Sequence, residues 1–171
     1  QPAADNQHRF LSQTDVVRFL YTTHAKELEP LLQADITSLG LVSAPVNDSE
    51  KKLVYITTKN SALTGFRKIT MHDLSAVPIL DENQALIANL SASDLRGINQ
   101  ATFKTTLLPV LEFLELRYGK AREVVACKPT DSLKTVIERI LGQRVHRIWV
   151  INDKKIVQGV VTLTDVICKF S

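Results

Sequence analysis

The chain has 171 residues, of which 44% are hydrophobic and 23% charged, and its formal net charge is +3. This apolar content can offset the entropy of the chain, so collagen-like, mucin-like and disordered classes are excluded. The length fits one domain, or two small ones packed together, with a core that needs no disulfide or metal.

The first segment, residues 1–43, reads as the tail of an earlier structural unit followed by a linker. It begins without Met and runs from "QPAADNQHRF" directly into "LSQTDVVRFL", so we expect a piece of a longer protein. Ser or Thr before Asp is a common helix start, and apolar residues then follow at helical spacing. The pattern predicts a helix from about Asp15 to Thr23.

The next segment, residues 44–109, alternates strand and helix signals. In chain order these are the strand "LVYIT", the helix "SALTGFRKITMH", the strands "SAVPIL" and "ALIANLS" around "DENQ", and a helix opening at "SDLRGI". A connecting helix over "ATFKTTLLPVLEFLELRYG" is expected to break or begin near Pro109, because proline suits only the first turn of a helix.

Residues 110–171 repeat this order. A short β-branched run, "EVVACKPTD", closes at Pro129, and Asp131 or Ser132 is expected to cap the helix "SLKTVIERILGQ", with Gly142 as its stop. Two strands surround the polar turn "NDKK", and "TDVICKF" opens the last helix. Strands that are nearly continuously apolar and alternate with helices predict an α/β fold with helices covering the sheet.

The two later segments are internal repeats. Residues 57–94 and 128–165 align without a gap at an offset of 71 (128 minus 57), and their strand, turn and helix signals fall in one order. The motif before each closing helix is "LSASD" and then "VTLTD", and "LSQTD" near the start is a further copy. Asp15, Asp94 and Asp165 therefore occupy equivalent positions.

Two β-α-β-β-α units that end in [ST]-x-[ST]-D resemble a tandem of cystathionine-β-synthase (CBS) motifs, the pair called a Bateman module. The segments "LSAVPILDENQALIANLSASDLRGI" and "VHRIWVINDKKIVQGVVTLTDVI" are similar to the third and fourth CBS motifs of γ regulatory subunits of AMP-activated protein kinases, especially plant γ-like relatives. The resemblance implies that motifs 44–109 and 110–171 pack about a pseudo-two-fold axis, after the tail of a preceding motif in 1–43. It also implies a non-catalytic regulatory module that binds AMP, ADP or ATP between paired motifs, with kinase α and β subunits or a second Bateman module as partners.

The last helix start has the chemistry of a phosphate and ribose site. Thr162 and Thr164 bring hydroxyls to the free N–H groups at a helix N-terminus, which favours phosphate, and Asp165 can accept hydrogen bonds from a ribose diol. The same residues also form an ordinary helix cap. Because the pattern occurs three times, we expect ligand contact together with capping.

His146 and Arg147 begin an otherwise apolar strand. Residues 117–147 carry eight Lys or Arg and three acids, a local charge of +5 (8 minus 3) that favours anions. In γ subunits the matching "VHR" residues contact nucleotide phosphate, which the resemblance transfers to His146 and Arg147; exposed surface charge is the alternative. We expect the better pocket to combine these two residues with Thr162 and Asp165.

The second copy lacks these basic residues, since Ser75 and Ala76 replace them. Thr58, with Thr57 as an alternative, is expected to offer a hydroxyl to the neighbouring pocket, and Arg96 is expected to face solvent. Three polar side chains remain at the helix start of this copy: Ser91, Ser93 and Asp94.

Other functions have weaker support in the sequence. No glycine-rich phosphate loop, nucleophile elbow or paired carboxylates are present, so we expect no enzyme. Aromatic residues do not interleave with the basic ones, which argues against nucleic acid, and the histidines and two cysteines lack metal-ligand spacing. No run approaches the ~18 apolar residues of a membrane span, and no signal peptide is visible, so we expect a cytoplasmic or nuclear location. A ligand-free interaction or dimerisation scaffold, and a regulatory insert of an enzyme or transporter, stay open as alternatives.

Overall fold

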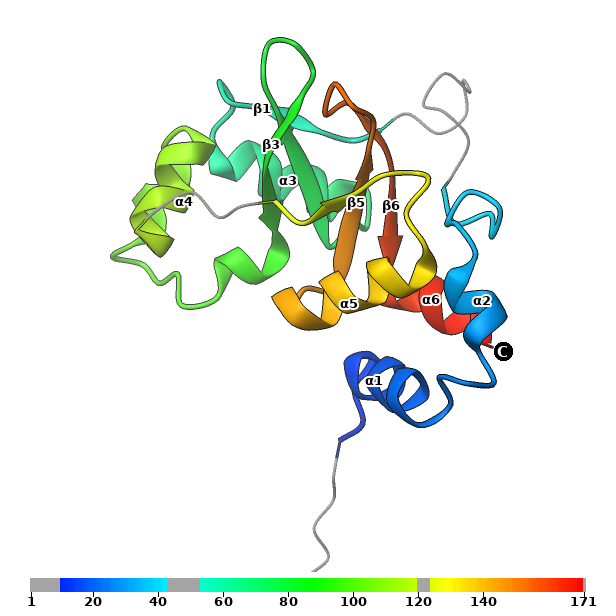
Figure 1. The fold of residues 1–171 in the computed structure, drawn as a ribbon. Helices are drawn as coiled ribbons and strands as arrows, with labels where there is room; N and C mark the ends of the chain where they lie inside the picture. The colour runs from blue at the N-terminus through cyan, green and yellow to red at the C-terminus, as the bar shows by residue number, and fades with distance from the viewer. Residues whose placement is uncertain (1–9, 43–52, 120–123, 171) are drawn as a thin grey trace, which may run out of the picture.

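Two small sheets, each with its own helices, make up the protein (Figure 1). The computed structural model describes residues 10–42, 53–119 and 124–170. The first sheet has the order β1-β2-β3 and the second β4-β5-β6, and in each a parallel strand pair adjoins an antiparallel hairpin.

The first unit consists of β1 (Ile56–Thr57), α3 (Ala62–Met71), β2 (Ala76–Leu80), β3 (Leu86–Ser91) and the 3₁₀ helix η1 (Ala92–Leu95). The second consists of β4 (Ala126–Cys127), α5 (Leu133–Gln143), β5 (Arg147–Ile151), β6 (Val157–Thr162) and α6 (Leu163–Phe170). The predicted α/β class is confirmed, and so is the β-α-β-β-α order, except that a 3₁₀ helix closes the first unit.

The repeated sequence produces repeated helix caps. The Ser61 hydroxyl caps α3 by accepting from the Thr64 N–H at 3.2 Å, and the Ser132 hydroxyl caps α5 by accepting from the Thr135 N–H at 3.2 Å. Each cap satisfies a backbone donor that the first turn of a helix leaves unpaired. Of the two expected caps for α5, Ser132 is the one in place.

The end of α5 differs from expectation. Gly142 was expected to stop this helix, but α5 continues to Gln143 and Arg144 takes the left-handed conformation, with φ 53°. Its N–H donates to the carbonyls of Ile140 and Leu141. The equivalent residue after α3, Asp73, is also left-handed, with φ 50°. The turn is therefore set by its position in the repeat, not by the nearest glycine.

The helix expected at "SDLRGI" is also shorter than expected. Only the 3₁₀ turn η1 forms, and Arg96 follows it with extended backbone. Gly97 then has a φ of 80°, which L-residues rarely adopt and which ends the helical path. The connecting region forms a 3₁₀ helix η2 (Phe103–Leu107) and the helix α4 (Val110–Tyr118), with Pro109 at the break as expected.

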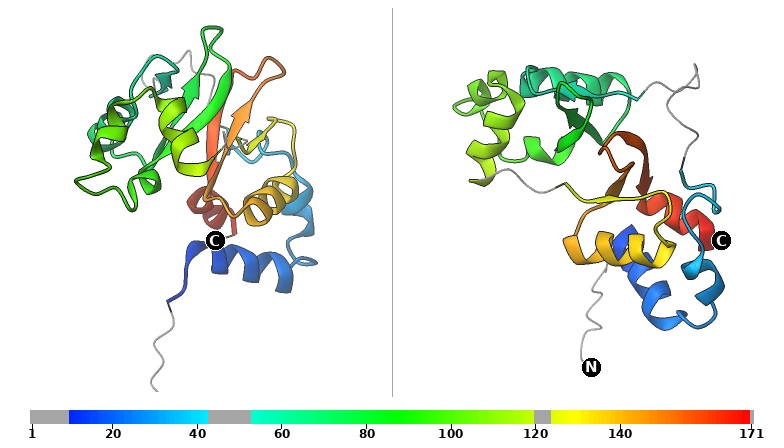
Figure 2. Two further views of the ribbon diagram at one scale, coloured as in Figure 1. Left: turned by 90° about the vertical axis from the view of Figure 1, so that its left-hand side faces the viewer. Right: turned by 45° about the horizontal axis from the view of Figure 1, so that its top comes forward.

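The N-terminal segment packs on the last motif (Figures 1 and 2). Helices α1 (Gln13–Thr23) and α2 (Glu29–Gln33) contribute to one core with α5 and α6. The Ile36 N–H donates to the carbonyl of Asp131 at 3.1 Å, just before α5. On the other motif, the Ala62 N–H at the start of α3 donates to the carbonyl of Leu108 at 3.1 Å. The segment preceding each motif thus pairs with the other motif, as a two-fold arrangement requires.

A third core joins the two sheets. Leu80 and Leu86 of the first hairpin meet Trp149 and Val157 of the second, and all four side chains are buried. The Leu86 N–H donates to the carbonyl of Lys155 at 2.9 Å, which ties the two hairpins together beside their turns. The motifs therefore share apolar and backbone contacts, and this fixes the space left between them.

Two helical glycines are expected to respond oppositely to alanine. A Cβ at Gly65 would lie 2.4 Å from Leu90 Cδ2 and 2.8 Å from Ile56 Cδ1, and both side chains are fully buried. Gly65→Ala should therefore cost about 1–3 kcal/mol of unfolding free energy by overpacking. At Gly142 nothing lies within 4 Å, so Gly142→Ala should add about 0.5–1 kcal/mol through helix propensity. Urea unfolding followed by circular dichroism measures both, and effects of equal sign would contradict this packing.

Candidate functional site

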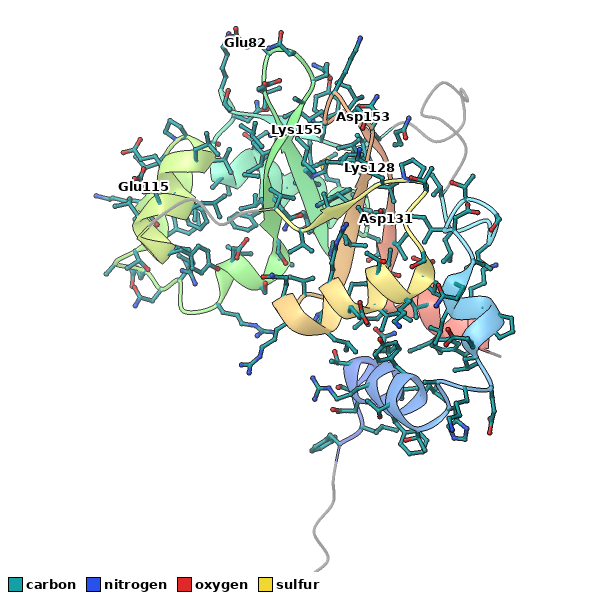
Figure 3. All side chains as sticks on the ribbon, in the orientation of Figure 1. Glu82, Glu115, Lys128, Asp131, Asp153 and Lys155 are labelled. Atoms are coloured by element: carbon teal, nitrogen blue, oxygen red, sulfur yellow. The ribbon has the colours of Figure 1, made fainter. Side chains whose placement is uncertain are left out.

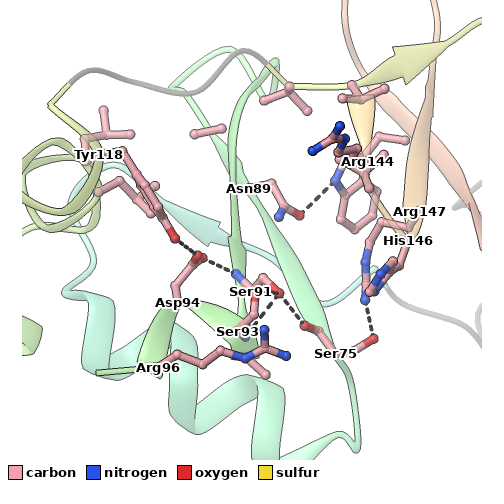
Figure 4. A pocket seen from close by; sticks show the side chains of 18 residues that line it. Ser75, Asn89, Ser91, Ser93, Asp94, Arg96, Tyr118, Arg144, His146 and Arg147 are labelled. Carbon is pink, nitrogen blue, oxygen red and sulfur yellow. Dashed lines mark hydrogen bonds between the residues drawn. The ribbon is translucent and has the colours of Figure 1, made fainter. Parts of the chain in front are cut away.

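A pocket of about 690 Å³ lies between the two motifs (Figure 4). This size falls within the ~300–1,000 Å³ of typical small-molecule sites. One wall comes from β3, η1 and α4, and the other from the residues between α5 and the start of β5. Polar and charged lining residues are Ser75, Asn89, Ser91, Ser93, Asp94, Arg96, Tyr118, Arg144, His146 and Arg147.

Asp94 is the acidic residue of this lining, and its side chain is held in place. The residue is only 5% exposed. Its Oδ2 accepts from the Ser91 N–H at 2.7 Å, and its Oδ1 accepts from the Tyr118 hydroxyl at 2.5 Å. A carboxylate has about four acceptor positions, so Asp94 retains capacity for a ligand hydroxyl. The fixed carboxylate can therefore act as a directional acceptor inside the pocket.

The opposite wall carries Arg147 and His146. Arg147 is half-buried and one of its terminal nitrogens donates to the Ser75 hydroxyl, across the gap between the motifs. Burial lowers the pKa of the Arg147 guanidinium, which nevertheless stays charged because arginine does not deprotonate in proteins. As expected, Ser75 adds no charge to the pocket. Its hydroxyl accepts a hydrogen bond from Arg147 of the other motif and so orients that side chain.

Two further arginines line the pocket. Arg96 follows η1 and Arg144 follows α5, and both are exposed (Figure 4). Arg96 is exposed, as expected, and the extended backbone after η1 also places it in the lining of the pocket. Arg117 fixes that backbone, since its terminal nitrogen donates to the Arg96 carbonyl at 2.5 Å.

The remaining lining is apolar and includes an indole. Trp149 is 5% exposed and belongs to the core between the sheets, as expected, yet one side of it also faces the pocket. Its Nε1–H donates to Asn89 Oδ1 at 3.0 Å, so the ring is held at a fixed angle. The aliphatic part is formed by Ala88, Ala92, Leu111, Leu114, Val124, Val125 and Val145. This surface suits a flat, weakly polar group such as a nucleobase.

The other expected site residues do not line this pocket. The carboxylate of Asp165 accepts from the Thr162 N–H at 2.8 Å and hydroxyl at 2.7 Å, while Thr164 accepts from the Gln13 amide of α1 at 2.9 Å. The pocket lies between the motifs, so the strand start of one motif faces the helix start of the other. His146 and Arg147 line this pocket together with Asp94, whereas Thr162 and Asp165 are not among its lining residues. The backbone nevertheless keeps the expected residues close, since Arg147 pairs with Thr162 across β5 and β6 and the Leu163 N–H donates to the His146 carbonyl at 3.2 Å.

Thr58 also lies elsewhere. It follows β1, which runs parallel to β2 with Thr57 opposite Leu80. Thr58 is thus at the end of the sheet where β2 finishes, and it is not among the residues that line the pocket.

All three repeated aspartates act as caps. The carboxylates of Asp15, Asp94 and Asp165 each accept from the N–H three residues earlier, at 3.0, 2.7 and 2.8 Å. Hydrogen bonds from Ser12 lower the pKa of Asp15. The capping role expected from the repeat is present in every copy, and at Asp94 it coincides with the pocket between the motifs.

Among the described basic residues of this run, four are outside the pocket lining: Arg117, Lys128, Lys134 and Arg139. Lys128, labelled in Figure 3, pairs with Asp153 at 2.5 Å, and Arg139 pairs with Asp131 at 2.7 Å. Such exposed pairs contribute at most about 1 kcal/mol each to stability. Of the described residues in the expected +5 region, Arg144 and Arg147 bring positive charge to the pocket lining, and Arg96 of the other motif adds to it.

Several lining residues had no clear signal in the sequence. Tyr118 lies at the end of α4 and Asn89 within β3, and neither belongs to a motif copy that repeats with the same residue type. Arg144 was visible only as one of many basic residues. Its left-handed conformation, which follows from the repeat position of Asp73, is the feature that distinguishes it.

The described residues form neither a membrane-spanning helix nor a metal-binding cluster. Within residues 10–42, 53–119 and 124–170, no helix combines the length and the apolar character needed to cross a membrane. In the same part of the chain, no three His, Cys, Asp or Glu side chains gather closely enough to hold a metal ion.

Comparisons of sequence identify related proteins. Residues 120–171 match the CBS domain family. A SNF1-related protein kinase regulatory subunit gamma-like protein of Arabidopsis thaliana is 34% identical over 176 residues, covering 94% of this chain and 48% of the relative. A 5′-AMP-activated protein kinase subunit gamma of Saccharomyces cerevisiae is 36% identical over 100 residues, covering 58% of this chain and 31% of the relative. The chain thus spans half the length, or less, of these relatives.

Solved structures share the fold at lower sequence identity. A Methanocaldococcus jannaschii protein, described as a candidate archaeal homolog of γ-AMPK, aligns with a TM-score of 0.69 and 17% identity over 94% of this chain and 54% of its own. A CBS domain pair in complex with 5′-methylthioadenosine and S-adenosyl-L-methionine aligns with a TM-score of 0.50 and 19% identity, over 74% of this chain and 95% of its own. The chain is a tandem CBS module that resembles the γ regulatory subunits of AMP-activated protein kinases.

Proposed function

We propose that this protein is a non-catalytic regulatory module that binds an adenine nucleotide in the pocket between its two CBS motifs. The observation that carries the proposal is the placement of a buried carboxylate, Asp94, opposite Arg147 and His146, with an apolar lining between them. A nucleotide needs these three surfaces, for its ribose, phosphate and base. The solved CBS pair with two adenosine derivatives supports the ligand class.

Each part of the nucleotide has a candidate partner. The base would lie against Trp149 and the aliphatic lining, where burial of apolar surface stabilises it. The ribose hydroxyls would donate to the Asp94 carboxylate, because an ionised carboxylate accepts hydrogen bonds and donates none. The phosphate would accept from Arg147, His146 and the Ser93 hydroxyl, and such charge-assisted hydrogen bonds are stronger than neutral ones. Ser91 would act indirectly, by holding Asp94 and Ser93.

The likeness to γ subunits extends the proposal to partners. We infer that the module belongs to a γ-type kinase regulatory subunit in the cytoplasm or nucleus, with kinase α and β subunits as its partners. Nucleotide binding would act by changing the relation between the module and these partners. A ligand shifts such an equilibrium only by its difference in affinity for the two states.

Calorimetric titration with AMP, ADP, ATP and S-adenosylmethionine tests the ligand class. We expect an adenine nucleotide to bind, and at a hundred times its Kd to raise the unfolding free energy by about 2.7 kcal/mol in a thermal-shift experiment. Arg147→Ala should weaken binding by about 10–100-fold, because it removes a charge-assisted hydrogen bond. Asp165→Ala is the control, since Asp165 lies outside the pocket lining.

The outcome also separates the alternatives. Wild-type binding that Asp165→Ala abolishes and Arg147→Ala leaves unchanged would place the ligand in a different cleft. No binding by any of the four compounds would contradict the proposal and favour the ligand-free scaffold. Exposed apolar side chains on and before α1, Phe10 and Phe19, are the surface to examine in that case.

A further inference from the structure

Arg144 occupies a backbone conformation that arginine does not favour. It is left-handed, with φ 53° and ψ 42°, and residues other than glycine adopt this region rarely and at a cost. The equivalent residue of the first motif is Asp73 (144 minus 71), and aspartate is one of the residue types enriched there. The position of the turn therefore follows from the repeat. The need for a left-handed residue at this turn does not explain why that residue is an arginine. The Arg144 side chain lines the pocket on the same wall as His146 and Arg147 (Figure 4).

Arg96 is likewise particular to its motif and is held by its neighbours. The equivalent residue of the last motif is Ile167 (96 plus 71), which packs beside an apolar core. The Arg96 N–H donates to the Ser93 carbonyl at 3.1 Å, and its carbonyl accepts from Arg117 at 2.5 Å. The Arg117 guanidinium in turn lies 5.9 Å and 5.8 Å from the ring centres of Phe113 and Tyr118. The backbone that carries Arg96 is thus fixed on the wall opposite Arg144.

Arg96 and Arg144 increase the negative charge that a ligand bound in the pocket can carry. Arg147 and His146 suffice to contact one phosphate group, and Asp94 faces the ribose side, where it already accepts from Tyr118. Arg96 and Arg144 then add two cations at the walls, and neither forms an ion pair among the described residues. Concentrated positive charge at a site raises its affinity for anions of higher charge. Each further phosphate of a ligand supplies such charge.

We infer that the pocket binds a nucleoside di- or triphosphate in preference to a monophosphate, with Arg96 and Arg144 binding the outer phosphates from opposite walls. This inference rests on the proposed function and makes it more specific. A guanidinium suits this role because its planar donors match phosphate oxygens in pairs. Arg147 and His146 keep the phosphate next to the ribose.

Calorimetric titration of the whole chain with ATP, ADP and AMP, without divalent cation, tests the inference. The variants are Arg144→Asn and Arg96→Gln, and the matched control is Arg67→Gln, an exposed arginine of α3 outside the pocket lining. We expect wild type to bind ATP at least about tenfold more tightly than AMP. Each pocket variant should weaken ATP about tenfold, the loss of one charge-assisted contact, and change AMP less than about twofold. Arg67→Gln should leave all three affinities unchanged.

A stability measurement separates ligand contact from a role in folding. Asparagine is tolerated in the left-handed region, so Arg144→Asn should unfold at the same temperature as wild type or higher. Equal wild-type affinities for AMP and ATP, or equal losses of both in the variants, would overturn the inference and leave the proposed function standing. No binding of any of the three nucleotides would overturn both.

Discussion

Substituting Ile36 by alanine is expected to lower the free energy of unfolding by about 2–5 kcal/mol. Ile36 is completely buried, although it lies between α2 and the residues outside the described range, in what the sequence indicated was a linker. It packs in one core with Val17, Leu32 and the residues of α5 and α6. Removing its methyl groups leaves a cavity that the two sets of helices must close. Equilibrium unfolding in urea, followed by circular dichroism, measures the loss.

Phe19→Ala is the matched control for this prediction. Phe19 belongs to the same N-terminal segment, but its side chain is 57% exposed. Its truncation should change the unfolding free energy by no more than about 0.5 kcal/mol. If Ile36→Ala lowered the unfolding free energy no more than Phe19→Ala, the N-terminal segment would not be part of the core of the last motif.

Asp94→Ala is expected to cost about 2–4 kcal/mol, more than the same change at the equivalent Asp165. Without the carboxylate, the Ser91 N–H and the Tyr118 hydroxyl each lose an acceptor at a position that is 5% exposed. Asp165 is more exposed, and among the described residues its carboxylate accepts hydrogen bonds from Thr162 alone. Asp165→Ala should therefore cost about 0.5–2 kcal/mol, as for a helix cap. The two proteins are compared by thermal and urea unfolding without ligand.

Tyr118→Phe isolates the contribution of the hydroxyl. It keeps the ring and the Ser91 bond to Asp94 but removes the donor to Oδ1, so its effect should lie between those of wild type and Asp94→Ala. Equal costs for Asp94→Ala and Asp165→Ala would show that the two aspartates are simple caps. A larger cost at Asp94 would show that hydrogen bonds from the protein hold the carboxylate in place before any ligand binds.

Together these results bear on how the pocket is organised. The carboxylate that faces the ribose side is held by Tyr118 of α4, and Arg96 is held by Arg117 of the same helix. One connecting helix therefore positions two of the charged groups on one wall. The opposite wall depends on the end of α5, where Arg144 is left-handed. Changes at the end of α4 or at the end of α5 would therefore alter the pocket without replacing Asp94, His146 or Arg147.

The order of the elements was predictable from the sequence because its causes are local. Ser61 and Ser132 cap their helices through bonds to residues three positions away, and apolar periodicity identified the strands and α5. The repeat offset also predicted that Asp94 and Asp165 would cap alike. The two errors at element ends have different sources: Gly142 was expected to stop α5, which instead ends before the left-handed Arg144, and the helix expected after Asp94 did not take Gly97 into account, whose φ is 80°.

The grouping of the site residues depended on the tertiary structure. Hydrophobic pattern and capping specify each motif by itself, but the contact of one motif with the other is made by residues far apart in the chain, such as Leu86 and Trp149. That contact places Arg147 against Ser75 and in the lining of the same pocket as Asp94, a lining that does not include Asp165. It also brings Ile36 beneath α5. The sequence by itself determined two β-α-β-β-α motifs with their polar helix starts; only their packing decided which helix start faces which strand, because that choice lies in the shape of the buried surfaces between them.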